Sequence, residues 1–136
     1  MLKEKLTIAI PTYNRINELI NLVNSINLVN NYKLTVLIID NKSDDEVEKK
    51  IVNECDSECL EFINNITNIG GNANILRCFE ACKTDWIWII GDDDIISKES
   101  LGILNNYISK YDHSIMMSFS SCEHQHNNDK LLKNLN

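Results

Sequence analysis

Three consecutive carboxylates follow a short apolar stretch, and their types and spacing suit metal chemistry. Residues 86–90 read Trp-Ile-Trp-Ile-Ile, and Gly91, Asp92, Asp93 and Asp94 come next. An apolar run of this length between polar residues indicates a strand buried on both faces, and Gly91 lets the backbone turn after it. Because neighbouring carboxylates repel one another, a divalent cation, which prefers oxygen ligands, would explain their grouping. A solvated acidic turn explains the spacing equally well.

The composition describes an acidic, folded domain. The chain has 136 residues, a formal net charge of −7 and 43% hydrophobic residues. That length suits one domain with its own core, and the apolar content is too high for a disordered chain. An acidic chain without a basic run is not expected to bind nucleic acid. No segment approaches the ~20 apolar residues of a membrane span, and no apolar signal block follows Met1. We therefore expect a cytoplasmic protein that enters its first strand directly.

The cysteines favour reduced thiols over disulfides or a metal site. Five cysteines, an odd number, occur without a secretory signal at positions 55, 59, 78, 82 and 122. Two pairs are spaced by four residues, which would suit zinc ligands on one helix face, but their apolar context favours small buried side chains. The late Cys122–His126 segment fits a solvated polar tail better than a metal site.

Apolar periodicity predicts strands that alternate with helices. Strands are expected at residues 6–10, 34–39, 59–63, 86–90 and 115–119. Pro11 lacks a backbone N–H and is expected to close the first strand. This alternation is typical of βαβ units, in which a parallel sheet is covered by helices on both faces.

Amphipathic helices are predicted between these strands. They are expected at residues 16–28, around residues 47–52, at about residues 72–83, and from Ser97 or Lys98 onward. Asn14 is expected to cap the first helix, and Ser43 or Asp44 the second. The second helix is expected to bury Val47, Ile51 and Val52. The third is expected to bury Ile75, Leu76, Phe79 and Cys82.

Polar residues follow three of the predicted strands at their carboxyl ends. Pro11 and Thr12 follow the first strand, Asp40 follows the second, and Asp92–Asp94 follow the fourth. Parallel strands bring their carboxyl ends to one edge of a sheet, where ligands of such folds bind. This convergence favours a functional acidic cluster over a solvated turn.

The residues at this edge indicate a metal-bound diphosphate rather than covalent catalysis. The sequence contains neither G-x-x-x-x-G-K-[ST] nor G-x-G-x-x-G, and the adjacent Gly70 and Gly71 fit a tight turn into a helix. All three histidines come late in the chain, so no Ser-His or Cys-His arrangement is expected. A metal that bridges a diphosphate would supply the charge neutralisation that Lys and Arg usually provide.

Four ordered motifs resemble those of the family 2 glycosyltransferases, which have the GT-A fold. The motifs are Ile8–Arg15, Val36–Asp45, Asn68–Asn72 and Ile89–Asp94. The resemblance covers roughly residues 5–120 and implies a Rossmann-like α/β fold, a three-layer α/β/α sandwich with a mostly parallel sheet. It implies that residues 1–122 are the N-terminal nucleotide-sugar-binding domain. Residues 123–136 are then a polar tail or the start of an acceptor-binding half.

The resemblance also implies an activity and the residues for it. The implied reaction is a metal-dependent, inverting transfer from a UDP-, GDP- or dTDP-sugar to a glycan or lipid-linked acceptor, in cell-envelope polysaccharide biosynthesis. The implied cofactor is Mg²⁺ or Mn²⁺, with Asp94 as the main ligand and Asp92 as the second. Peripheral association with the inner face of the plasma membrane is implied at family level. The implied nucleotide-sugar-binding residues are Pro11, Thr12, Asn14, Asp40, Asn68, Gly70, Asn74, Arg77, Asp92 and Asp93.

Two departures from the family pattern bear on activity. Gly91 stands where many members carry an acidic residue. Glu99 and Glu123, which follow the Asp cluster, are considered as the general base, and neither is assigned that role. The alternative function is therefore a non-catalytic nucleotide-sugar-binding module, or a fragment that lacks the acceptor half. Arg77 on its own fits a solvated helix residue better than a ligand contact.

Overall fold

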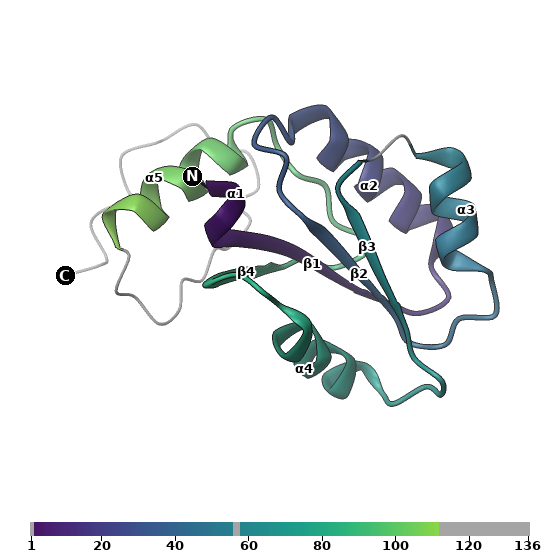
Figure 1. The fold of residues 1–136 in the computed structure, drawn as a ribbon. Helices are drawn as coiled ribbons and strands as arrows, with labels where there is room; N and C mark the ends of the chain where they lie inside the picture. Colours follow the sequence, from purple (N-terminus) through teal and green to yellow (C-terminus); the bar gives the residue numbers. More distant parts are fainter. Residues whose placement is uncertain (1, 56–57, 112–136) are drawn as a thin grey trace, which may run out of the picture.

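Within the described part of the chain, four parallel strands form a central sheet (Figure 1). The computed structural model describes residues 2–55 and 58–111. The strands are β1 (Leu6–Thr12), β2 (Val36–Asp40), β3 (Leu60–Asn64) and β4 (Trp86–Ile89). Their order is β3-β2-β1-β4, and each neighbouring pair is parallel. The predicted fifth strand, residues 115–119, lies outside the described residues, as does the Cys122–His126 segment.

Helices cover both faces of this sheet. They are α1 (Leu2–Lys5), α2 (Ile16–Val29), α3 (Val47–Glu54), α4 (Gly71–Ala81) and α5 (Ser100–Lys110). The larger hydrophobic core joins α2, α3 and α5 to one face, through a cluster that includes Ile8, Leu22, Ile38, Ile51 and Leu104. A smaller core joins α4 to the opposite face, below the sheet in Figure 1. The predicted three-layer α/β/α class is confirmed. None of the described helices is long and apolar enough to cross a membrane.

Strand β1 continues through Pro11 to Thr12, so the expectation that proline closes this strand is wrong. Backbone groups alternate sides along β1. Thr12 O accepts from Asn41 N on the β2 side, and Ala9 O accepts from Ile90 N on the β4 side. The Pro11 nitrogen therefore faces β4, beyond the end of that strand, where no ladder bond needs an N–H. Thr12 is thereby held at the carboxyl edge of the sheet.

The prediction that the chain enters its first strand directly and the predicted caps of α2 and α3 are also wrong. The chain begins with the short helix α1 instead of entering β1 directly. Arg15 and Glu46 occupy the N-cap positions of α2 and α3, and neither makes a side-chain cap hydrogen bond. Instead, Asn14 N donates to the Ser43 hydroxyl, and the Asn14 side chain bonds to Asp44. These three side chains therefore join two loops at the sheet edge rather than ending helices.

Helix α4 buries a different face from the predicted one. Leu76 is 62% exposed and Phe79 55% exposed, whereas Asn74 and Cys78 are buried. Ile75 is also exposed. The buried part of the sheet face that meets α4 is small, consisting of Ala9, Leu37 and Ile39. Because the Asn74 amide finds hydrogen-bond partners at this face, it occupies a core position that periodicity assigns to an apolar residue.

Val52 and β4 are less buried than predicted. Val52 is 61% exposed, because the short helix α3 turns Val47 and Ile51 to the core instead. The four residues of β4 are only half-buried. Among the described strands β4 has a neighbour on one side only, β1, which explains its partial exposure.

Cys55, Cys78 and Cys82 are free thiols, as predicted. Cys78 is fully buried in the smaller core, and burial raises the pKa of its thiol to about 11. We expect Cys78 to resist alkylation by iodoacetamide in the folded protein, since the thiolate is the reactive form. The half-buried Cys82 should react at least about tenfold faster, and denaturant should equalise the two. Mass spectrometry of native and denatured samples tests this, and equal native rates would contradict it.

Candidate functional site

The three consecutive aspartates form a tight turn directly after β4. Asp94 N donates to Gly91 O at 3.1 Å, and Gly91 N donates to Asp94 Oδ2 at 3.0 Å. A Cβ at residue 91 would lie 3.1 Å from an Asp93 oxygen and 3.2 Å from an Asp94 oxygen. Gly91 does not have a positive φ, and a side chain at this position would require the two carboxylates to shift by a few tenths of an ångström.

Asp92 points into the sheet edge and links this turn to β1. Thr12 Oγ1 donates to Asp92 Oδ2 at 2.8 Å. Arg15, at the start of α2, places Nη1 2.6 Å from Asp93 Oδ2 and 3.7 Å from Asp92 Oδ1. Burial raises the pKa of Asp92, although the Thr12 hydrogen bond and the Arg15 charge act in the opposite direction. The hydrogen bond to Asp93 raises the pKa of Arg15, so a permanent cation lies at the acidic turn.

Replacing Asp92 with Asn is expected to stabilise the folded domain at neutral pH. The raised folded-state pKa means that the folded state holds this proton more tightly than the unfolded chain does. The tighter proton binding stabilises the folded state below the ordinary aspartate pKa, and this stabilisation is lost as pH rises through the raised pKa of Asp92. The amide that replaces the carboxylate would keep an acceptor for the Thr12 hydroxyl without a buried charge.

Thermal unfolding of the parent and Asp92→Asn proteins, measured from about pH 3 to about pH 7, tests this expectation. The difference in stability should grow in favour of the variant as pH rises. A variant less stable than the parent at neutral pH would contradict the sign of the effect.

Asp40 ends β2 and organises the loop that follows. Its carboxylate accepts from the Ser43 backbone N–H at 3.1 Å and from the Ser43 hydroxyl. Asn14 N donates to Ser43 Oγ at 2.8 Å, and the Asn14 amide exchanges two hydrogen bonds with Asp44. Asn14 and Lys42 have φ values of 53° and 66°. Left-handed backbone at non-glycine residues costs free energy and persists where neighbours hold it, often at functional sites.

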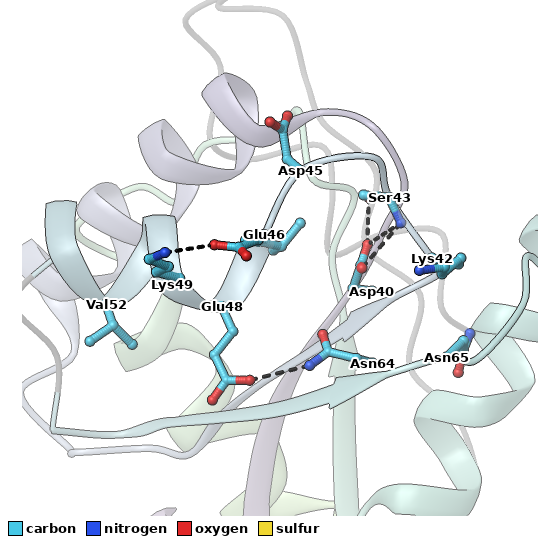
Figure 2. Close-up of a pocket in the computed structure, with 11 residues that line it drawn as sticks. Asp40, Lys42, Ser43, Asp45, Glu46, Glu48, Lys49, Val52, Asn64 and Asn65 are labelled. Atoms are coloured by element: carbon cyan, nitrogen blue, oxygen red, sulfur yellow. Dashed lines mark hydrogen bonds and ion pairs between the residues drawn. The ribbon is translucent and has the colours of Figure 1, made fainter.

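A cavity of about 590 Å³ opens beside Asp40 (Figure 2). Its wall comes from the loop after β2, the start of α3 and the end of β3, where Asn64 bonds to Glu48. Asp92–Asp94 do not line it. Thr12 pairs with Asp40 in the sheet and bonds to Asp92. The cavity and the acidic turn are therefore neighbouring parts of one edge.

The predicted site residues after β3 fall into two groups. Asn68 and Gly70 lie on the exposed loop before α4, and Gly70 N donates to Asn68 Oδ1 at 2.9 Å. Asn74 is buried and donates to a β2 carbonyl at 3.0 Å. Arg77 is exposed, and its Nε donates to Asn65 Oδ1 at 3.3 Å. Asn68, Gly70 and Arg77 are therefore exposed to solvent, whereas Asn74 faces the sheet.

The acidic turn suits a cation that brings part of its own coordination shell. Within the described residues, no three Asp, Glu, His or Cys side chains converge on one point, because Asp92 turns toward Thr12 and Asp93 toward Arg15. Asp94 is exposed. Mg²⁺ commonly binds through one or two carboxylates together with substrate phosphates and waters. The donor set therefore fits a divalent cation that arrives with a diphosphate.

Sequence reasoning missed several residues that hold this site in place. Arg15 lies in the first motif and is the one cation there, which was a usable signal for its contact with the aspartates. Asn41 directly follows β2, and Asn65 directly follows β3. The strand-end argument that selects Asp40 applies equally to these two amides, although they carry no charge to mark them.

The sequence matches the Glycosyl transferase family 2 model over residues 7–134. It is 34% identical over 126 residues to the uncharacterized glycosyltransferase MG060 of Mycoplasma genitalium. This alignment covers 87% of the present chain and 42% of MG060. It is 36% identical over 107 residues to the abequosyltransferase RfbV of Salmonella typhimurium. This alignment covers 76% of the present chain and 32% of RfbV. The chain thus spans less than half the length of both relatives.

Solved structures share the fold. S. aureus TarS 1–349 superposes with a TM-score of 0.70 at 22% identity, covering 79% of this chain and 33% of that one. The mannosyltransferase PcManGT from Pyrobaculum calidifontis, in complex with GDP-Man and Mn²⁺, superposes with a TM-score of 0.67 at 15% identity, covering 77% and 32%. With the parallel sheet, the acidic turn after β4 and a family match over nearly the whole sequence, this chain belongs to glycosyl transferase family 2.

Proposed function

We propose that this chain is the donor-binding part of a glycosyltransferase that moves a sugar from a nucleotide-diphosphate sugar to a glycan or lipid-linked acceptor. The observation that carries the proposal is the convergence of Thr12, Asp40 and Asp92–Asp94 at one edge of a family 2 sheet. The relatives' names support the same reaction, since one is an abequosyltransferase. Structural neighbours were solved with UDP, UDP-GlcNAc and GDP-Man.

In this proposal the edge is divided between the two ends of the donor. The base and ribose lie toward Pro11, Thr12 and Asp40, and Asp93 reaches the ribose. Asp94, with Asp92, holds Mg²⁺ or Mn²⁺. Such a cation, when bound, neutralises charge that develops on the departing nucleoside diphosphate.

The acceptor side of the reaction rests on the family resemblance. Inversion at the sugar needs a general base, which we assign to an acceptor-binding half rather than to a described residue. We place the activity in cell-envelope polysaccharide biosynthesis, at the cytoplasmic face of the plasma membrane. Sequencing the gene beyond Asn136 tests this division directly, because an acceptor-binding half would be encoded there.

Calorimetric titration tests the donor part of the proposal. The protein is titrated with UDP, GDP and dTDP, each with Mn²⁺ and again with a chelator. At least one nucleoside diphosphate should bind, and removing the metal should weaken that binding at least about tenfold. Absence of metal-dependent binding for all three nucleotides would overturn the proposal.

A second candidate is a non-catalytic nucleotide-sugar-binding module. It is the alternative if the matched region, which spans 42% and 32% of the two relatives, acts alone. Such a module would bind the donor as above but would transfer no sugar. Detectable transfer by these 136 residues alone would remove this candidate.

A further inference from the structure

Four asparagine side chains form a continuous hydrogen-bonded cluster beside Asp40. We call this cluster the asparagine clamp, and its members are Asn41, Asn65, Asn68 and Asn74. Asn65 Nδ2 donates to Asn41 Oδ1 at 3.1 Å and to Asn74 Oδ1 at 2.8 Å. Asn41 Nδ2 donates to Asn68 Oδ1 at 2.9 Å. Asn74 Nδ2 completes the clamp by donating to a backbone carbonyl of β2 at 3.0 Å.

The clamp joins four segments that are separate in the sequence: the end of β2, the end of β3, the loop before α4, and α4 itself. It also holds the backbone of the loop. Ile69 N donates to Asn41 Oδ1, and Gly70 N donates to Asn68 Oδ1, both at 2.9 Å. The loop of residues 65–70 therefore cannot shift without breaking hydrogen bonds to the end of β2.

Three of the four clamp residues, Asn41, Asn65 and Asn74, are buried and have hydrogen-bond partners, whereas Asn68 is exposed. Asn41 and Asn74 are each 2% exposed. Every buried side-chain nitrogen and oxygen in the described part of the chain has a hydrogen-bond partner. Desolvating an amide offsets most of what its hydrogen bonds contribute, so such a network adds little net stability over apolar packing. What it does provide is one specific geometry for the segments that it joins.

The clamp lies next to Asp40, where the base and ribose of the nucleotide are proposed to bind. Asn41 directly follows Asp40, and Asn65 N donates to Asp40 O at 2.8 Å. Asn65 Oδ1 accepts from Arg77 Nε at 3.3 Å. The same two amides therefore set the loop and an exposed guanidinium relative to the carboxylate that ends β2.

We propose that Asn41 and Asn65 are positioning residues, which hold the loop of residues 65–70 and the Arg77 guanidinium in the arrangement that binds the nucleotide. This inference rests on the proposed function. Neither amide has to touch the nucleotide, because each acts through the groups that it holds. A loop already held in the free protein loses less conformational entropy on binding, so the clamp raises affinity without adding a contact.

Calorimetry with UDP and with GDP, each in the presence of Mn²⁺, tests the proposal on Asn41→Ala and Asn65→Ala. Asn53→Ala is the matched control, because Asn53 is an exposed asparagine on α3. The dissociation constant of the nucleotide that the parent binds should rise at least about tenfold in both clamp variants and stay unchanged in the control. If Asn41→Ala does not fold, Asn41→Ser keeps a side-chain acceptor and takes its place.

Amide hydrogen exchange separates positioning from a loss of overall stability. In Asn41→Ala the amides of Ile69 and Gly70 should exchange at least about tenfold faster, while the amides of β1 keep their protection. A uniform increase in exchange, with affinity lowered only in proportion to the unfolded fraction, would show a merely structural role and overturn the proposal.

A double-mutant cycle tests whether Asn65 acts through Arg77. Asn65→Ala should weaken nucleotide binding less in the Arg77→Ala background than in the parent. Additive effects would remove Arg77 from the proposal. If the parent binds a nucleoside diphosphate and both clamp variants bind it at least as tightly, this inference alone is overturned. A parent that binds no nucleoside diphosphate would overturn the proposed function, and this inference with it.

Discussion

Asp94→Ala is expected to lose metal-dependent nucleotide binding while it keeps the fold. Asp94 is exposed at the carboxyl edge, and one of its oxygens accepts from the Gly91 N–H of its own turn. If Asp94 is the main carboxylate ligand of a cation that bridges a diphosphate, as proposed, its removal should raise the dissociation constant for nucleotide with Mn²⁺ at least about 100-fold. The melting temperature should change by no more than a few degrees, as is usual for exposed positions.

Calorimetry with UDP and GDP, with and without Mn²⁺, measures this loss. Asp85→Ala is the matched control, because Asp85 is an exposed aspartate just before β4, at the opposite end of that strand. The control should bind as the parent does. If Asp94→Ala binds either nucleotide with Mn²⁺ as well as the parent, Asp94 is not the metal ligand.

Ile38→Ala is expected to have the largest effect on stability. Ile38 lies at 0% exposure in the middle of β2, within the larger core. Truncating a buried isoleucine removes apolar contacts and leaves a cavity, which costs about 2–5 kcal/mol of unfolding free energy. Domains of this kind are stable by about 5–15 kcal/mol, so the variant should lose a large share of its stability, and its melting temperature should fall by about 10 °C or more.

Chemical denaturation of the parent and the variant gives the free energy of unfolding directly. Leu28→Ala is the control, since Leu28 is 83% exposed on α2 and its truncation should change stability by no more than about 0.5 kcal/mol. Equal effects of the two substitutions would mean that the β2 side chain is not packed as described.

Binding and stability are therefore expected to depend on different residues of the same strands. The strand interiors hold the apolar core, and their carboxyl ends hold the polar groups. Asp92 shows that the two requirements conflict at one position, because burial raises its pKa and thus disfavours the charged form. We expect Asp92→Asn to weaken metal-dependent nucleotide binding while it stabilises the domain, a trade-off that is common at functional sites.

The sheet and most helix boundaries were readable from local pattern. Apolar runs predicted β2, β3 and β4 to within two residues at each end. Helix α2 ends one residue beyond its predicted end. These predictions succeed because strand and helix periodicity act over neighbouring residues. The face that α4 buries could not be predicted in this way, because Asn74 is acceptable in a core only when partners from β2 and β3 satisfy its amide.

The sequence by itself determined the order of the elements, the family, and the placement of Thr12, Asp40 and the three aspartates at strand ends. Each of these follows from local pattern or from ordered motifs. Only the tertiary structure decided which side chains meet: Thr12 with Asp92, Arg15 with Asp93, and the members of the asparagine clamp with one another. Those contacts join residues 9–80 positions apart, and a hydrogen bond across such separations depends on how the strands pack, which no local pattern encodes.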